Sequence, residues 1–129
     1  MIDSRDPYYT GTFWENIGVD GTATLAPTSL AHGRASGPTP AMTGYVLGVQ
    51  PADPGYRTFT IAPHPGSLTW ADGTVPTPYG RIAVRGSRHG HRITLTVTVP
   101  PTTTALVTLP DGHHVTLPGG TTRTLNSDR

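Results

Sequence analysis

The second half of the chain consists of short segments in which apolar and polar residues alternate. The clearest segment runs from residue 92 to residue 100, and its apolar members are Ile93, Leu95, Val97 and Val99, with threonines between them. Successive side chains of a β-strand point to opposite faces, whereas a helix repeats every 3.6 residues. The alternation therefore predicts a strand with one buried and one solvated face.

Six further segments show a similar pattern. They are residues 56–61, 67–75, 80–87, 104–110, 113–118 and 121–125. Glycine and proline, which number 16 and 14, supply the turns between them, and "RHGH" before residue 92 is typical of a hairpin turn. Seven short strands at regular spacing favour a mainly β fold, an antiparallel β-sandwich. The threonines imply that each sheet keeps one wet face.

Charge and composition exclude several classes of function. The net charge is +1, which gives no electrostatic basis for binding nucleic acid or a membrane surface. The absence of cysteine excludes disulfides and thiolate chemistry. We find no apolar run of 18 residues and no signal peptide pattern, so we expect no transmembrane segment and leave the compartment open. No motif calls for a cofactor, and we expect none.

The first part of the chain has a different pattern. Residues 1–28 show no sustained period, and the one helix that we expect spans about 39–48, where Ala41, Met42, Tyr45 and Val46 fall at helical spacing. The proline- and glycine-rich stretch at 50–55 then marks a candidate boundary. We therefore expect two parts, residues 1–50 and residues 51–129.

Glu15 is the sole glutamate of the chain, and it follows Trp14 directly in a segment rich in turn residues. One interpretation is a solvated loop residue. The other is a catalytic carboxylate in a carbohydrate site, where the apolar C–H face of a sugar packs on an aromatic ring.

Four stretches together resemble one family of enzymes. They are "TFWE" at 12–15, "SLAHG" at 29–33, "YVLGV" at 45–49 and the segment that begins "PGYRTFTIAPHPGSLTWADG" at 54. In this order they are similar to the C-terminal end of bacterial α-L-rhamnosidases, a family of inverting glycoside hydrolases. The resemblance implies the last turns of an (α/α)₆-barrel catalytic domain in residues 1–50. It also implies the family's C-terminal β-sandwich in residues 51–129.

The resemblance also implies roles for three residues and a class of substrate. Glu15 stands where the family has its general base, Trp14 resembles an aromatic wall of the sugar site, and His32 resembles a histidine that hydrogen-bonds the sugar. The alternatives are packing under the loop for Trp14 and a capping or loop role for His32. Rhamnose-containing glycosides are the substrates that the resemblance implies.

The sequence departs from the family pattern because it shows no general acid. An inverting glycosidase needs two carboxyl groups, a general acid and a general base, and this chain has no second glutamate. Asp3, Asp6 and Asp20 are the nearest aspartates, and no pattern singles out any of them. We therefore expect the chain alone to be inactive, with the missing barrel portion or a second copy of the chain as its partner. The alternative is a sandwich module that binds carbohydrate or a protein without chemistry.

Other residues suggest sites less strongly. Four histidines, His89, His91, His113 and His114, lie in turn sequences without the carboxylate or cysteine spacing of a metal site, so we expect no metal. Trp70 and Tyr79 flank a loop, and we expect them in the core and at the edge of the sandwich rather than on a carbohydrate platform.

Overall fold

The computed structural model describes residues 4–5, 7–22 and 29–128. The chain forms two compact units, Met1–Pro40 and Ala41–Arg129. The second unit carries the strands, and the first carries Trp14, Glu15 and His32.

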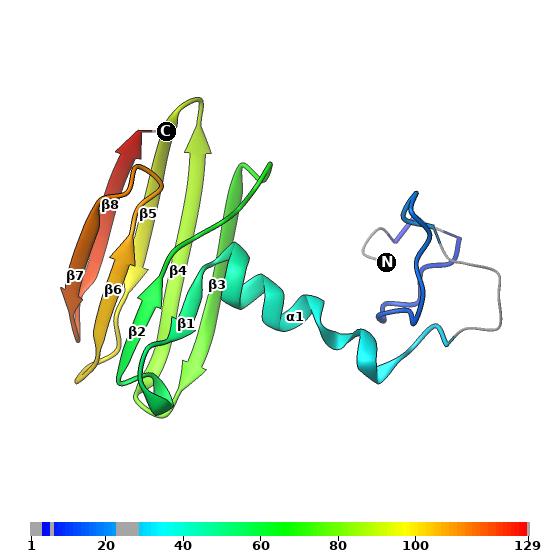
Figure 1. Cartoon of the computed structure of the whole chain (residues 1–129), viewed down its shortest axis with the longest axis horizontal. Helices are drawn as coiled ribbons and strands as arrows, with labels where there is room; N and C mark the ends of the chain where they lie inside the picture. The colour runs from blue at the N-terminus through cyan, green and yellow to red at the C-terminus, as the bar shows by residue number, and fades with distance from the viewer. Residues whose placement is uncertain (1–3, 6, 23–28, 129) are drawn as a thin grey trace. The chain divides into compact units, whose positions relative to one another are not determined.

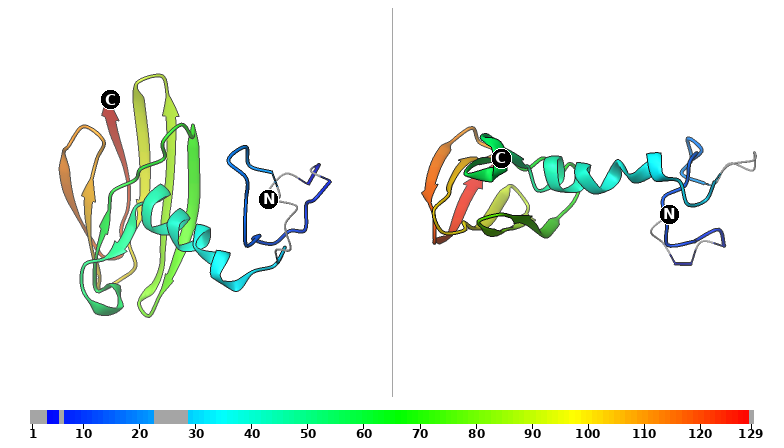
Figure 2. Two further views of the ribbon diagram at one scale, coloured as in Figure 1. Left: turned by 45° about the vertical axis from the view of Figure 1, so that its right-hand side comes forward. Right: turned by 90° about the horizontal axis from the view of Figure 1, so that it is seen from below.

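Two four-stranded sheets make up the second unit, and they lie face to face (Figures 1 and 2). One sheet has the order β1-β2-β6-β7 and contains β1 Val49–Pro51, β2 Thr58–Ile61, β6 Thr104–Thr108 and β7 His114–Pro118. The other has the order β3-β4-β5-β8 and contains β3 Trp70–Thr77, β4 Gly80–His89, β5 Arg92–Thr98 and β8 Thr122–Asp128. The predicted β-sandwich is confirmed, and each of the seven expected segments carries a strand.

Two features of the first sheet were not anticipated. The short strand β1 adds to its edge, pairing antiparallel with β2. The next pair, β2 and β6, runs parallel, with Phe59 opposite Ala105. A parallel pair needs a long crossover connection, and here the chain passes through β3, β4 and β5 of the other sheet between the two strands.

The side chains of β5 alternate between a buried and a solvated face, as the sequence predicts. Leu95 and Val97 are buried in the core between the sheets, as is Val99 just after the strand, and Ile93 is half-buried. Three threonines on the other side of β5 reach hydroxyl or amide groups of β8 at 3.0 Å each: Thr94 to Asn126, Thr96 to Thr124 and Thr98 to Thr122. Such cross-strand pairs on a solvated face contribute to the pairing of β5 with β8.

The hairpin between β4 and β5 forms where "RHGH" predicts it. His89 pairs with Arg92, which leaves Gly90 and His91 as the loop. Gly90 has a φ of 62°, and His91 has no positive φ. Glycine in this position is the requirement of a type II′ turn, whose twist matches that of paired strands.

The expected helix is present as a short α-helical turn followed by a π-helical one. These are α1 Pro38–Ala41 and η2 Met42–Val46, with 3₁₀ turns at Gly33–Ser36 (η1) and Pro54–Tyr56 (η3). Pro38 opens α1, where a missing N–H costs little. Met42 and Tyr45 are exposed. Across the described residues, no helix has the length and apolar character needed to span a membrane.

Candidate active site

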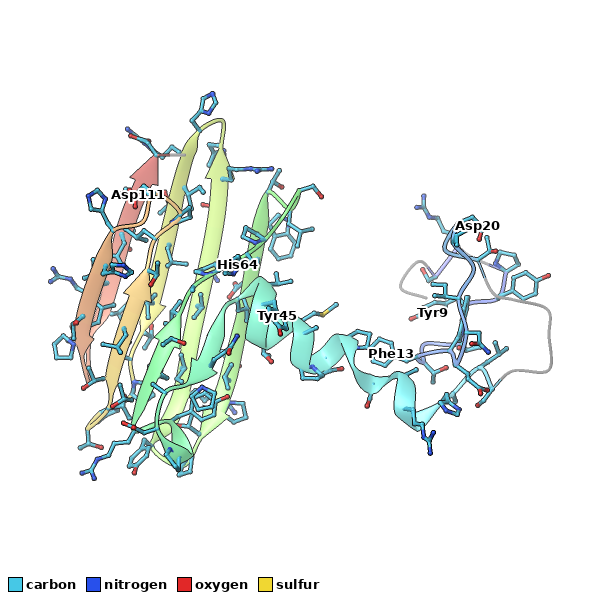
Figure 3. The ribbon with its side chains drawn as sticks, in the orientation of Figure 1. Tyr9, Phe13, Asp20, Tyr45, His64 and Asp111 are labelled. Carbon is cyan, nitrogen blue, oxygen red and sulfur yellow. The ribbon has the colours of Figure 1, made fainter. Side chains whose placement is uncertain are left out.

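Backbone pairing brings two segments of the first unit together. The Glu15 N–H donates to the Ser29 carbonyl, and the His32 N–H donates to the Phe13 carbonyl, each at 2.9 Å. The Thr12 hydroxyl adds a bond to the Leu30 carbonyl. The residues around "TFWE" and "SLAHG" therefore lie side by side, and Phe13 is labelled in this region in Figure 3.

This pairing places the side chains of Glu15 and His32 next to each other. The Glu15 Oε2 atom accepts the Ser29 N–H at 3.0 Å and lies 3.7 Å from the His32 Nδ1 atom. The two side chains remain 39% and 31% exposed, respectively. The backbone therefore holds the Glu15 carboxylate in place, and the carboxylate stays partly open to water.

Trp14 lies in a different environment from the residue that follows it. Only 3% of its surface is exposed, and its indole N–H donates to the Thr10 hydroxyl at 2.9 Å. Burial of so large a side chain fixes the backbone just before Glu15. The contact of Trp14 with a sugar stays a prediction.

Asp20 is poorly suited to be the acid partner of Glu15. Its carboxylate accepts the backbone N–H of Thr22 at 3.1 Å and the Thr22 hydroxyl at 2.8 Å. These bonds favour the charged form and lower the pKa of Asp20, whereas a general acid needs a raised pKa. Asp3 and Asp6 lie outside the described residues.

The two aromatic residues flanking β3 are more exposed than a core position allows. Trp70 is 69% exposed at the first residue of β3, and Tyr79 is 37% exposed in the turn after it. Because β3 is an edge strand, the expected edge position is confirmed for Trp70. Neither residue lies in the core, so the expected core position is wrong for both. Strand β3 is eight residues long, roughly 25 Å, so Trp70 at its start and Tyr79 in the turn after its end cannot form one platform.

The histidine-rich turns lie in the sandwich. His113 Nδ1 is 3.1 Å from Asp111 Oδ2, and His114 Nδ1 is 3.1 Å from the Thr108 hydroxyl. His89 ends β4, and His91 follows in the hairpin loop. Within residues 4–5, 7–22 and 29–128, no three His, Cys, Asp or Glu side chains gather as a metal site would require.

Two four-stranded sheets that lie face to face define the second unit as a β-sandwich domain. The family model described as the bacterial alpha-L-rhamnosidase C-terminal domain matches residues 48–124, more than half of the chain. The chain therefore belongs to this family, as a C-terminal portion of an α-L-rhamnosidase.

Curated relatives agree with this assignment. The chain is 32% identical to an α-L-rhamnosidase of Streptomyces avermitilis over 102 residues, which cover 78% of the chain and 10% of that protein. It is 39% identical to an α-L-rhamnosidase of Formosa agariphila over 66 residues, 50% of the chain and 7% of that protein. The chain thus spans about a tenth or less of these relatives.

Solved structures show the same relationship. The native α-L-rhamnosidase of Aspergillus terreus matches with a TM-score of 0.77 and 28% identity over 89% of the chain and 14% of that protein. The Streptomyces avermitilis enzyme, solved in complex with L-rhamnose, matches with a TM-score of 0.63 and 34% identity over 79% of the chain and 10% of that protein.

Proposed function

We propose that the chain is the C-terminal part of an inverting α-L-rhamnosidase and that Glu15 is its general base. Residues 1–50 are then the end of the helical barrel, and residues 51–129 are the sandwich that follows it. The observation that carries the proposal is the Glu15 carboxylate, held by the Ser29 N–H, adjacent to His32 and still partly open to solvent.

In this proposal Glu15 takes a proton from a water molecule as that water attacks the anomeric carbon of a rhamnoside. The bond from that carbon to the leaving oxygen breaks on the opposite face, and the leaving oxygen takes its proton from the general acid. His32, on the same side as Glu15, hydrogen-bonds a sugar hydroxyl. Rhamnose as the sugar is supported by the Streptomyces avermitilis relative, whose structure holds L-rhamnose.

We infer that the 129 residues alone do not turn over substrate, because the general acid is missing from them. General acid catalysis typically contributes about 10²–10⁴-fold to the rate, and Asp20 has a lowered pKa. The chain should release no aryl alcohol from an aryl α-L-rhamnoside above the buffer rate. Release that Glu15→Gln abolishes would overturn the claim of inactivity and leave Glu15 as a catalytic residue.

A second candidate function is a sandwich that binds carbohydrate without chemistry, and the exposed Trp70 favours it. An exposed indole ring offers a surface on which the C–H face of a sugar packs. Titration with L-rhamnose separates the two candidates. Loss of binding in Trp70→Ala supports the sandwich, whereas loss in His32→Ala alone supports the Glu15 site.

A further inference from the structure

An open hollow lies in the sandwich between the β2–β3 connection and the β6–β7 turn. Its volume is about 520 Å³, within the range of roughly 300–1,000 Å³ typical of small-molecule sites. Figure 3 labels His64 in the first of these segments and Asp111 in the second. His64 is part of the lining and is exposed.

The walls of this hollow are mainly apolar. They include Pro63, Pro65, Ile93, Leu109 and Pro110. A smaller hollow of about 40 Å³ shares Pro63, Pro65, Ile93 and Pro110 with it and extends to Trp70. Rigid proline rings and aliphatic side chains present C–H surfaces, which suit the C–H face of a pyranose ring better than a fully hydrated ion.

Arg88 of β4 lines both hollows. Its backbone N–H donates to the Thr69 carbonyl at 2.7 Å, and its guanidinium reaches the carbonyls of Gly66 and Ser67 at 3.5 and 3.3 Å. A guanidinium has five N–H donors, so these two long bonds leave donors for another acceptor.

The neighbouring arginines differ from Arg88 in having a carboxylate nearby. Arg85 lies 2.7 Å from Asp72, and Arg92 lies 3.9 Å from Asp128. No carboxylate of the described residues forms such a pair with Arg88. A half-buried guanidinium at an apolar hollow, with no described carboxylate in ion-pair contact, favours an anionic ligand that also has an apolar face.

We propose that this hollow binds a carboxylate-bearing sugar, with the carboxylate on Arg88, a hydroxyl on His64 and the C–H face of the ring on the prolines. A single guanidinium matches the single charge of a carboxylate in a bidentate pair. The proposal does not depend on Glu15, because it uses only residues of the sandwich.

The test is a titration of the full chain followed by NMR. D-glucuronate is the probe, and D-glucose, acetate and L-rhamnose are the comparison ligands. We expect glucuronate to shift the amide signals of Ile93 and Leu109 with a Kd on the order of 1 mM, typical of so small a ligand. Glucose, acetate and rhamnose should bind at least about tenfold more weakly, because each lacks the carboxylate or the ring.

Two variants and a matched control localise the binding. Arg88→Gln should weaken glucuronate binding at least about tenfold, as expected for loss of a charge-assisted pair, and His64→Ala should weaken it less. Arg81→Gln removes the same charge from an exposed position on the same strand and should leave the Kd unchanged. The amide spectrum of each variant reports whether it is folded.

Several results would overturn the proposal. Equal affinity for glucose and glucuronate would remove the role of the carboxylate, and equal affinity for acetate would remove the role of the ring. Unchanged binding in a folded Arg88→Gln variant, or no shift at about 50 mM glucuronate, far above the expected Kd, would each contradict it.

Discussion

Gly48 occupies a position in which no other residue fits, and its replacement by alanine tests the packing of the sandwich. It links η2 to β1 with a φ of +71°, a left-handed conformation that side chains disfavour. A Cβ atom on Gly48 would lie 2.1 Å from the Ala62 carbonyl oxygen and 2.5 Å from the Pro63 nitrogen. Both obstacles are backbone atoms, so a side-chain rotation cannot relieve the clash.

The expected cost follows from what must move. The chain at residue 62 would have to shift by roughly 1.3 Å or more to reach van der Waals distance. That shift breaks the hydrogen bond from the Ala62 N–H to the Gly48 carbonyl, 3.0 Å long, and displaces the buried pair Val49 and Ile61. Left-handed strain of about 1–2 kcal/mol, a hydrogen bond of about 1 kcal/mol and repacking of about 1–3 kcal/mol give about 3–6 kcal/mol in total.

The assay is urea unfolding followed by circular dichroism, with Gly44→Ala as the matched control. Gly44 lies inside η2 with no positive φ and no atom within 4 Å of its would-be Cβ. Gly44→Ala should therefore raise the free energy of unfolding by up to about 1 kcal/mol. A Gly48→Ala variant within about 1 kcal/mol of the unmodified chain would refute the packing at β1.

Three further predictions concern single side chains. The hydroxyls of Thr103 and Thr121 each donate a hydrogen bond to the carbonyl of the proline three residues earlier, at 2.8 and 2.7 Å, but only Thr103 is buried. In urea unfolding, Thr103→Val should lower the free energy of unfolding by about 1 kcal/mol, and Thr121→Val by less than half of that. Equal losses would contradict the burial argument. The backbone N–H and side chain of His113 lower the pKa of Asp111 to about 2. The stability that this carboxylate contributes is therefore present above about pH 4 and lost as the pH falls toward 2. In Asp111→Asn the melting temperature should depend less on pH in this window, and an unchanged pH profile would refute the assignment. Tyr45 is 64% exposed, and Met42 on the same helical turn is also exposed. We therefore expect the chain to self-associate with rising concentration in sedimentation velocity, and Tyr45→Ser to reduce this association. A monomer at all concentrations would contradict this prediction.

The strands could be predicted because their information is local. In β5, Leu95 and Val97 face the core simply because side chains of a strand alternate. The parallel pairing of β2 with β6 could not be predicted in this way, since alternation says which face is buried and not which strand is the neighbour. The short strand Val49–Pro51 was missed because three residues are too few to show a period.

The candidate active site depends on contacts between distant segments. Glu15 and His32 were identified through the family resemblance, whereas their proximity follows from backbone bonds between residues 13–15 and 29–32. The sequence suggests burial for Trp70 because it is an aromatic residue in an alternating segment, but at the start of an edge strand the sheet does not cover it. The sequence gives no sign of a role for Arg88 because its hollow is assembled from three separate segments.

The most direct test of the account replaces the tenth of the Streptomyces avermitilis enzyme that this chain matches with residues 1–129. The account predicts that this chimaera hydrolyses an aryl α-L-rhamnoside and that Glu15→Gln lowers kcat by about 10²–10⁴-fold. Azide, a nucleophile that needs no deprotonation, should restore product formation in that variant. An active chimaera whose kcat is unchanged by Glu15→Gln would contradict the assignment of Glu15 as the general base.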